Sequence, residues 1–200
     1  MIKAVIFDWG GVIAPNPNGG WLHVLATILD MTIDEILPHW RAAGYEDLSK
    51  GTINETKFWS QLERSLGKPL PDEKERIWTN GTALHPWPQV LSLVDWLRKK
   101  GIISVVLSNV VRPVSTILRR EGLYNEFDIV VLSDEVGLVK PDAAIYRLAL
   151  DKLGLRADEC IYIDDLPKNL TPAAALGMAV VLALDDPDKI VFDVKSLILS

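Results

Sequence analysis

The stretch KAVIFDWGGV, residues 3–12, places an aspartate and two adjacent glycines directly after a short apolar run. The run is rich in Val and Ile and shows no alternation of polar and apolar residues. This pattern is typical of a strand that is covered on both faces by helices. We therefore predict a buried strand over residues 3–8, which carries Asp8 at its carboxyl end.

Similar apolar runs recur along the chain and alternate with amphipathic helical patterns. The further strand candidates are residues 102–108, 127–133, 160–164 and 179–184, and the helical patterns cover residues 89–100, 111–121, 142–153 and 167–176. A glycine follows each of these helical patterns and marks its end. The alternation indicates βαβ units, so we predict an α/β fold with a doubly wound, Rossmann-like parallel sheet.

The alternation is interrupted after the first strand, where only helix-like segments separated by Gly, Pro and Asn occur. Thr32 and Glu35 form a capping-box pattern at the start of one of these segments, and Gly67 marks the end of another. An insert that leaves the carboxyl end of a strand lies above the crevice where α/β sheets bind ligands. We therefore predict a helical cap over residues 15–84 on a core formed by residues 1–14 and 85–200.

Composition limits the classes of function that the chain can have. It has 200 residues, of which 48% are hydrophobic, and a net charge of -6, which argues against general nucleic-acid binding. The apolar runs are much shorter than the roughly 18 residues that a membrane helix needs. A single cysteine, Cys160, and the lack of a signal-peptide pattern favour a cytoplasmic protein without disulfides. No pattern in the sequence indicates an oligomeric state.

Polar residues also follow the ends of the other predicted strands. They are Ser108, Asn109, Lys140, Asp164 and Asp165. Because the carboxyl ends of parallel strands meet at one edge of a sheet, we expect these side chains to converge with Asp8. Each of them alone could simply form a turn or cap a helix. Together they supply a carboxylate nucleophile, hydroxyl and amide donors, one cation and a pair of carboxylates.

In this order, the segments resemble the motifs of the haloacid dehalogenase-like (HAD) hydrolase superfamily. FDWGGV at residues 7–12 is similar to its first motif, LSN at 107–109 to its second, the segment around Lys140 to its third, and IDDLPKN at 163–169 to its fourth. SDEVGLVKPDAAIY at residues 133–146 resembles the phosphatase branch, which carries a type-1 helical cap. The resemblance covers nearly the whole chain and implies a hydrolase that uses Mg²⁺.

The resemblance also implies a role for each site residue. Asp8 would attack phosphorus and form an aspartyl-phosphate, with Lys140 as the second catalytic residue. The implied metal ligands are Asp8, the carbonyl of Gly10 and Asp165, with Asp164 as a further ligand or a supporting partner. The groups implied to hold the phosphoryl oxygens are Ser108, Asn109, Lys140 and the amides of Trp9 and Gly10. These roles predict Mg²⁺-dependent hydrolysis of a small phosphorylated metabolite, a phosphate monoester.

Gly10 departs from the pattern of most phosphatases of this family, which carry a second aspartate there for acid–base catalysis. Such catalysis is worth about 10²–10⁴-fold, so its loss matters least for leaving groups that are stable anions. His23 is the best candidate replacement, although an ordinary helix residue is the simpler interpretation. Two alternatives remain open: a metal-independent 2-haloacid dehalogenase-like hydrolase, and a non-catalytic protein that binds a phosphorylated ligand. The pair Asp164 and Asp165 favours the phosphatase because adjacent carboxylates suit a cation.

Overall fold

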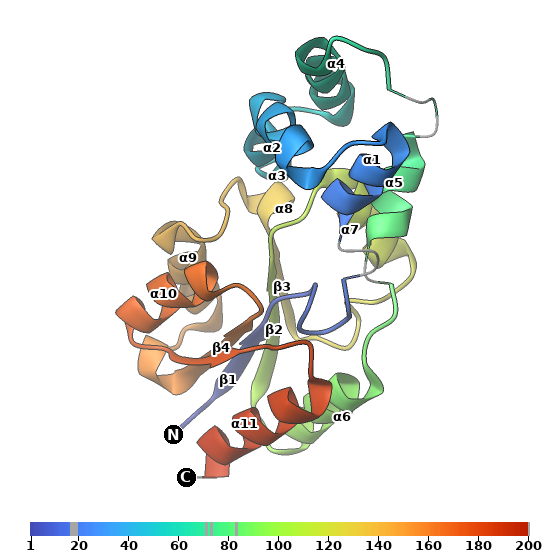
Figure 1. Cartoon of the computed structure of the whole chain (residues 1–200). Coiled ribbons are helices and arrows are strands. Elements are labelled where there is room, and N and C mark those ends of the chain that lie inside the picture. The colour runs from blue at the N-terminus through green and yellow to red at the C-terminus, as the bar shows by residue number, and fades with distance from the viewer. Residues whose placement is uncertain (17–19, 71, 73, 83, 200) are drawn as a thin grey trace.

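A five-stranded parallel sheet with the order β3-β2-β1-β4-β5 forms the centre of the protein (Figure 1). The computed structural model describes residues 1–16, 20–70, 72, 74–82 and 84–199. The strands are β1 (Ala4–Phe7), β2 (Ile103–Ser108), β3 (Ile129–Leu132), β4 (Cys160–Asp164) and β5 (Ala179–Leu182). All four pairings of neighbouring strands are parallel, which confirms the predicted α/β fold.

Helices cover both faces of this sheet and form the helical segment that is inserted after β1. They are α1 (Trp21–Leu29), α2 (Ile33–Ala42), α3 (Tyr45–Ser49), α4 (Glu55–Leu66), α5 (Lys74–Gly81), α6 (Pro88–Lys99), α7 (Arg112–Arg120), α8 (Ser133–Val136), α9 (Ala143–Leu153), the 3-10 helix η2 (Ala157–Glu159), α10 (Pro167–Leu176) and α11 (Pro187–Leu199). None of the helices in the described residues is long and apolar enough to cross a membrane.

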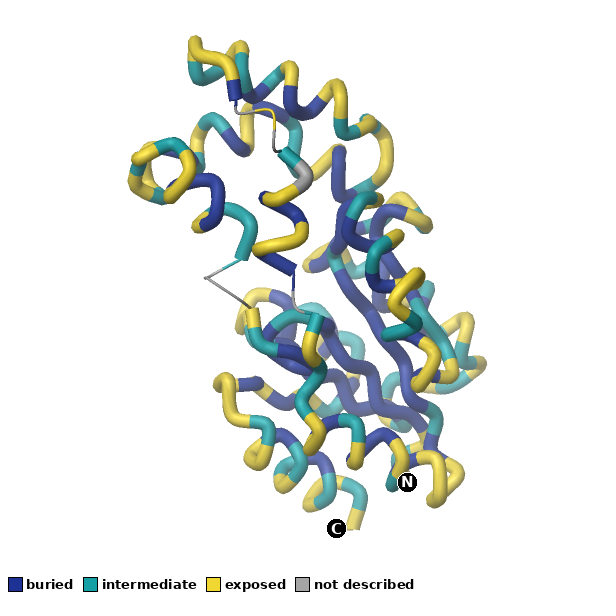
Figure 2. Tube along the Cα trace, turned by 90° about the vertical axis from the view of Figure 1, so that its right-hand side faces the viewer, coloured by how far each residue is buried: buried dark blue, intermediate teal, exposed yellow. Residues whose placement is uncertain are grey.

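The central strands of the sheet are buried (Figure 2), and their successive side chains enter two different hydrophobic cores. Ile6 of β1 packs into the core that α9 and α10 cover, whereas Phe7 packs into the core that α6, α7 and α11 cover. Cys160 is buried in the first of these cores, and burial raises the pKa of its thiol to about 11. In this environment Cys160 is a small core residue.

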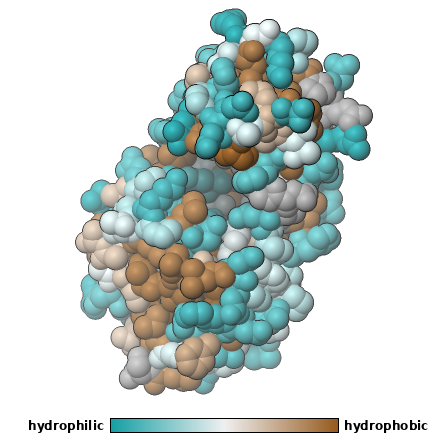
Figure 3. Space-filling view, in the orientation of Figure 1, coloured by the Kyte–Doolittle hydropathy of each residue, from teal (hydrophilic) through white to brown (hydrophobic). Residues whose placement is uncertain are grey.

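The sheet edge formed by β5 is less well covered than its centre. Val180 and Leu182 are each 36% exposed, and Figure 3 shows an apolar area over this part of the molecule.

The strands lie where the sequence predicts them, but most of them are one or two residues shorter at an end than predicted. The sequence analysis did not predict α8 or α11. Phe127, expected in the third strand, instead lies before β3 and packs edge-to-face against Phe7 with the ring centroids 6.0 Å apart.

Of the helices between β1 and β2, α1 to α5 form the insertion, and α6 packs on the sheet. The insertion lies at the end of the molecule opposite the two chain termini (Figure 1). The predicted capping box is present at α2: the Thr32 hydroxyl accepts the Glu35 amide at 3.3 Å, and the Glu35 carboxylate accepts the Thr32 amide at 2.8 Å. Gly67 ends α4 with a φ of 69°, in the left-handed region that glycine favours. The domain boundaries at residues 15 and 84 stay a prediction.

Tryptophans hold the inserted helices together. The ring of Trp78 on α5 lies 5.1 Å from Trp59, 5.4 Å from Trp21 and 6.0 Å from Trp40, measured between centroids. Glu55 at the start of α4 accepts hydrogen bonds from the indole nitrogens of Trp59, at 2.8 Å, and Trp78, at 2.5 Å. One carboxylate therefore satisfies two indole N–H groups whose residues are almost fully buried.

We predict that Glu55→Ala destabilises the protein by about 1–3 kcal/mol, because two buried N–H groups lose their acceptor. The measurement is the free energy of unfolding from urea titration, followed by tryptophan fluorescence. Glu46→Ala, which removes an exposed carboxylate paired only with Lys50, should have little effect. Equal stability of the two variants would show that the Glu55 contacts contribute nothing.

Candidate active site

Lys140 lies at the centre of the polar groups that gather at the carboxyl ends of the strands. Its ammonium nitrogen lies 2.8 Å from Oδ1 of Asp8 and 2.7 Å from Oδ2 of Asp164. The side chains of Lys140 and Asp164 are 1% and 0% exposed. Burial opposes the charge of Lys140, but the two carboxylates outweigh it and raise the pKa of the ammonium. The structure thus brings together the ends of β1 and β4 and the loop that follows α8.

Asp164 uses both of its carboxylate oxygens within the protein. Oδ1 accepts the amide of Leu166 and the side-chain amide of Asn169, both at 2.9 Å, and Oδ2 accepts the Tyr162 hydroxyl in addition to Lys140. Burial opposes the ionisation of Asp164, but Lys140 and these hydrogen bonds hold its pKa below the usual value. Asp164 is therefore a fixed anion that positions Lys140.

Asp8 and Asp165 are in a different electrostatic state. Burial is the main cause that raises the pKa of Asp8 to about 6 and that of Asp165 to about 7, and neighbouring carboxylates add to the shift of both. One oxygen each of Asp8, Asp164 and Asp165 lies within 4.8 Å of the others. Three carboxylates around one ammonium leave an excess of negative charge. The residues therefore fit a hard divalent cation, which prefers oxygen ligands.

The turn after β1 shapes one side of this cluster. The amide of Trp9 donates to Oδ1 of Asp8 at 2.7 Å, and the carbonyl of Trp9 accepts the amides of Ile13 and Ala14 at 2.9 and 3.1 Å. Gly11 has a φ of +73°, and a Cβ there would lie 2.7 Å from Oδ2 of Asp165. Only glycine combines this backbone conformation with such a close approach.

Asn109 holds the loop that carries Lys140. Its side-chain nitrogen donates to the Lys140 carbonyl at 2.9 Å, and its side-chain oxygen accepts the Lys140 amide at 2.8 Å. Both polar atoms of Asn109 are therefore used for positioning, and its direct contact with a phosphoryl group stays a prediction. Ser108 is buried and lines the same cavity as Asp8.

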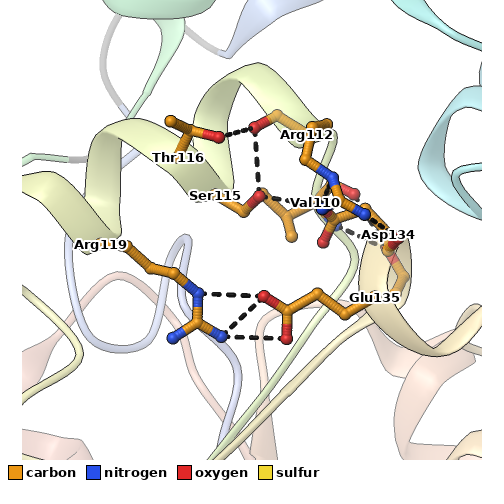
Figure 4. A network of polar contacts seen from close by, with 8 residues as sticks. Val110, Arg112, Ser115, Thr116, Arg119, Asp134 and Glu135 are labelled. Carbon is orange, nitrogen blue, oxygen red and sulfur yellow. Dashed lines mark hydrogen bonds and ion pairs between the residues drawn. The ribbon is translucent and has the colours of Figure 1, made fainter.

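A polar network beside this loop fixes α7, which begins shortly after Asn109 (Figure 4). Oδ2 of Asp134 accepts the Ser115 hydroxyl at 2.8 Å and pairs with Nε of Arg112 at 3.0 Å. Arg119 binds both carboxylate oxygens of Glu135. These contacts join α7 to α8 and so link the segments that follow β2 and β3.

A cavity of about 330 Å³ opens between the sheet and the inserted helices. All of the predicted site residues except Asp164 line this cavity. They are Asp8, Trp9, Gly10, Ser108, Asn109, Lys140 and Asp165. The inserted helices contribute Trp21 and Tyr45. His23 is exposed on α1 and is not among the described lining residues, which agrees with its interpretation as an ordinary helix residue.

Two groups that support Asp164, the Tyr162 hydroxyl and the side-chain amide of Asn169, are not among the predicted site residues. In the structure both donate to Asp164, and the Tyr146 hydroxyl donates to the Asn169 carbonyl at 2.7 Å. A tyrosine two residues before Asp164 puts its side chain on the same face of the strand, which is the available sequence signal.

Residues 2–177 match the model of the haloacid dehalogenase-like hydrolase family. Putative phosphatase YhcW of Bacillus subtilis is 27% identical to the chain, and the alignment covers 95% of this chain and 86% of YhcW. The chain spans between 19% and 37% of the length of several other curated relatives that it matches.

Solved structures share the whole architecture. A HAD-like family hydrolase from Porphyromonas gingivalis is 25% identical, with a TM-score of 0.81 over 98% of both chains. A HAD family enzyme from Bacteroides thetaiotaomicron, in complex with magnesium and inorganic phosphate, is 22% identical, with a TM-score of 0.75 over 93% of this chain and 97% of that one. The second similarity shows a common fold.

We predict that divalent cations bind more weakly as the pH falls, because Asp165 and Asp8 must lose their protons to bind a cation. Between about pH 8 and about pH 5.5 the affinity for Mg²⁺ should fall at least about tenfold, as measured by titration calorimetry. Asp165→Asn should bind weakly at both pH values. An affinity of the unsubstituted protein that is independent of pH would contradict the assignment of these carboxylates.

Proposed function

Because the chain belongs to the haloacid dehalogenase-like hydrolase family, we propose that it is a Mg²⁺-dependent phosphatase that hydrolyses a small phosphate monoester through Asp8. The observation that carries the proposal is the buried ammonium of Lys140 between Asp8 and Asp164, with Asp165 next to them. Asp8, Lys140 and Asp165 line the cavity, where a phosphate dianion would meet a nucleophile and a cation.

Asp8 is prepared to act as the nucleophile. Its Oδ1 atom is held by Lys140 and by the Trp9 amide, whereas Oδ2 makes no hydrogen bond to the described part of the chain. With a pKa of about 6, the carboxyl is mostly ionised at neutral pH. Attack by Oδ2 forms a bond to phosphorus, and the bond from phosphorus to the leaving oxygen breaks with its electron pair on that oxygen. Water then attacks phosphorus, the bond from phosphorus to Oδ2 breaks with its electron pair on the Asp8 carboxylate, and inorganic phosphate leaves while the proton of water passes to solvent.

The carboxylates of Asp8 and Asp165 and the carbonyl of Gly10 would hold Mg²⁺, and Asp164 would support the site through Lys140. When bound, the cation relieves the repulsion between these carboxylates and a phosphate dianion. The Bacteroides thetaiotaomicron enzyme, which has the same fold, binds magnesium and inorganic phosphate together, and this supports the same ligand class here.

The remaining polar groups would bind the phosphoryl oxygens. Lys140 offers the buried positive charge, Ser108 a hydroxyl, and the turn after Asp8 the backbone amide of Gly10. Because these groups are held in place before the substrate binds, they stabilise charge in the transition state without a cost of reorganisation. Asn109 would act mainly by holding Lys140.

We predict that Asp8→Asn abolishes the hydrolysis of an aryl phosphate, because an amide oxygen is a poor nucleophile. The assay is phosphate release in the presence of Mg²⁺. The fold should survive because Asn keeps an oxygen that can accept the Trp9 amide, and circular dichroism checks this. Asp158→Asn, an exposed position paired with Arg156, is the matched control and should keep full activity. Activity of Asp8→Asn within a few-fold of the unsubstituted protein would reject Asp8 as the nucleophile.

The same assay separates the alternative functions. A phosphatase loses activity with a chelator, whereas a dehalogenase releases halide from a 2-haloacid without metal. The excess of carboxylates around Lys140 argues against the dehalogenase, because a carboxylate substrate would add further negative charge. Binding of vanadate without turnover of any phosphate ester would indicate a non-catalytic protein.

A further inference from the structure

The side chain of Asn16 occupies the space next to Gly10. A Cβ on Gly10 would lie 2.3 Å from Oδ1 of Asn16 and 3.3 Å from its Nδ2. Asn16 reaches this place because the turn after β1 reverses the chain: the Gly11 amide donates to the Ala14 carbonyl at 2.7 Å, and Asn16 follows two residues later. A side chain from position 16 thus lies where a side chain from position 10 would begin.

Asn16 also lines the cavity together with Asp8 and Lys140. Its amide makes no hydrogen bond to the part of the chain that the structure describes, and the residue is exposed. The phosphoryl group has its own proposed partners at Lys140 and Ser108. The oxygen that departs from phosphorus needs a partner of its own, and Asn16 is a polar lining residue that has no other role in the proposed function.

We infer that Asn16 binds the leaving-group oxygen and that the enzyme is therefore selective for phosphates whose leaving group is a stable anion, such as aryl and acyl phosphates. The inference rests on the proposed phosphatase function. The Nδ2 group of Asn16 donates a hydrogen bond but has no proton to transfer at neutral pH. When the bond from phosphorus to oxygen breaks, the electron pair and the negative charge stay on the leaving oxygen, and the hydrogen bond stabilises that charge only in part.

The other described residues that line the cavity support this selectivity. They include no histidine and no glutamate, and Asp8, Asp165 and Lys140 already bind one another or the proposed cation. Lys168 also lines the cavity, as an exposed ammonium. Trp21 and Tyr45 from the inserted helices add aromatic surface to the same cavity. Such a wall suits the flat apolar body of an aryl group.

The test is the dependence of kcat/KM on the leaving group, measured with Mg²⁺ on dinitrophenyl, nitrophenyl and phenyl phosphate and on glycerol phosphate. For the unsubstituted protein, kcat/KM should fall steeply from the first to the last. Asn16→Asp supplies a transferable proton and should raise the hydrolysis of phenyl and glycerol phosphate by about tenfold or more, which flattens the dependence. Asn16→Ala should lower phenyl phosphate hydrolysis about tenfold and keep the steep dependence. Asn125→Asp, the same change at an exposed turn, should change nothing.

A second pair of variants tests whether positions 10 and 16 share one space. Gly10→Asp should also raise the hydrolysis of phenyl and glycerol phosphate, because the new carboxyl group supplies a transferable proton. The new side chain would also displace the flexible end of Asn16. Adding Asn16→Ala to Gly10→Asp should then change kcat/KM by less than about twofold, since Gly10→Asp has already displaced the Asn16 amide from the leaving oxygen. A loss equal to that of Asn16→Ala alone would mean that the two positions act independently and would contradict the inference.

The outcomes separate this inference from the proposed function. If Asp8→Asn abolishes turnover but Asn16→Asp and Asn16→Ala keep the rates and the leaving-group dependence of the unsubstituted protein, Asn16 does not contact the leaving group. If no phosphate is hydrolysed in a manner that depends on Asp8 and Mg²⁺, both proposals fail. Circular dichroism and Mg²⁺ titration of each variant establish that it is folded and binds the cation.

Discussion

The ion pairs of Lys140 with Asp8 and Asp164 are the constraint on which the rest of the site depends. A buried charge without a partner is strongly destabilising, and the buried ammonium of Lys140 has Asp8 and Asp164 as its partners. Those carboxylates follow adjacent strands, β1 and β4, whose register is set by the sheet. The sheet and the ion pairs therefore stabilise each other and hold these side chains in place.

The charge of the cluster also determines its chemistry. Lys140 neutralises one carboxylate, whereas Asp8, Asp164 and Asp165 contribute three, and the pKa values of Asp8 and Asp165 are raised as a result of burial and repulsion. Asp164 avoids this repulsion because Tyr162, Asn169 and a backbone amide bind it. One aspartate is thus kept ionised by contacts within the protein, and its two neighbours have the chemistry to hold a cation.

Much of the fold and the convergence of the polar strand ends could be predicted because parallel strands leave the sheet at one edge. The apolar runs identified the strands, and glycines marked the helix ends. The contact of Asn169 could not be predicted, since it depends on how α10 packs against β4, whereas Tyr162 lies two residues before Asp164 on the same face of the strand. The same limit applies to Asn16, whose approach to Gly10 results from a turn conformation that no residue pattern specifies. The helix α11 was missed although its apolar residues follow a helical period.

Two parts of the structure form the cavity. The segments at the strand ends supply Asp8 and Lys140, and the inserted helices supply Trp21 and Tyr45. Substitutions of the lining residues on α1 or α3 can therefore change the shape of the cavity while the ion pairs of Lys140 stay intact. Such a division would let the aromatic wall of the cavity vary between related proteins while the charged cluster stays the same.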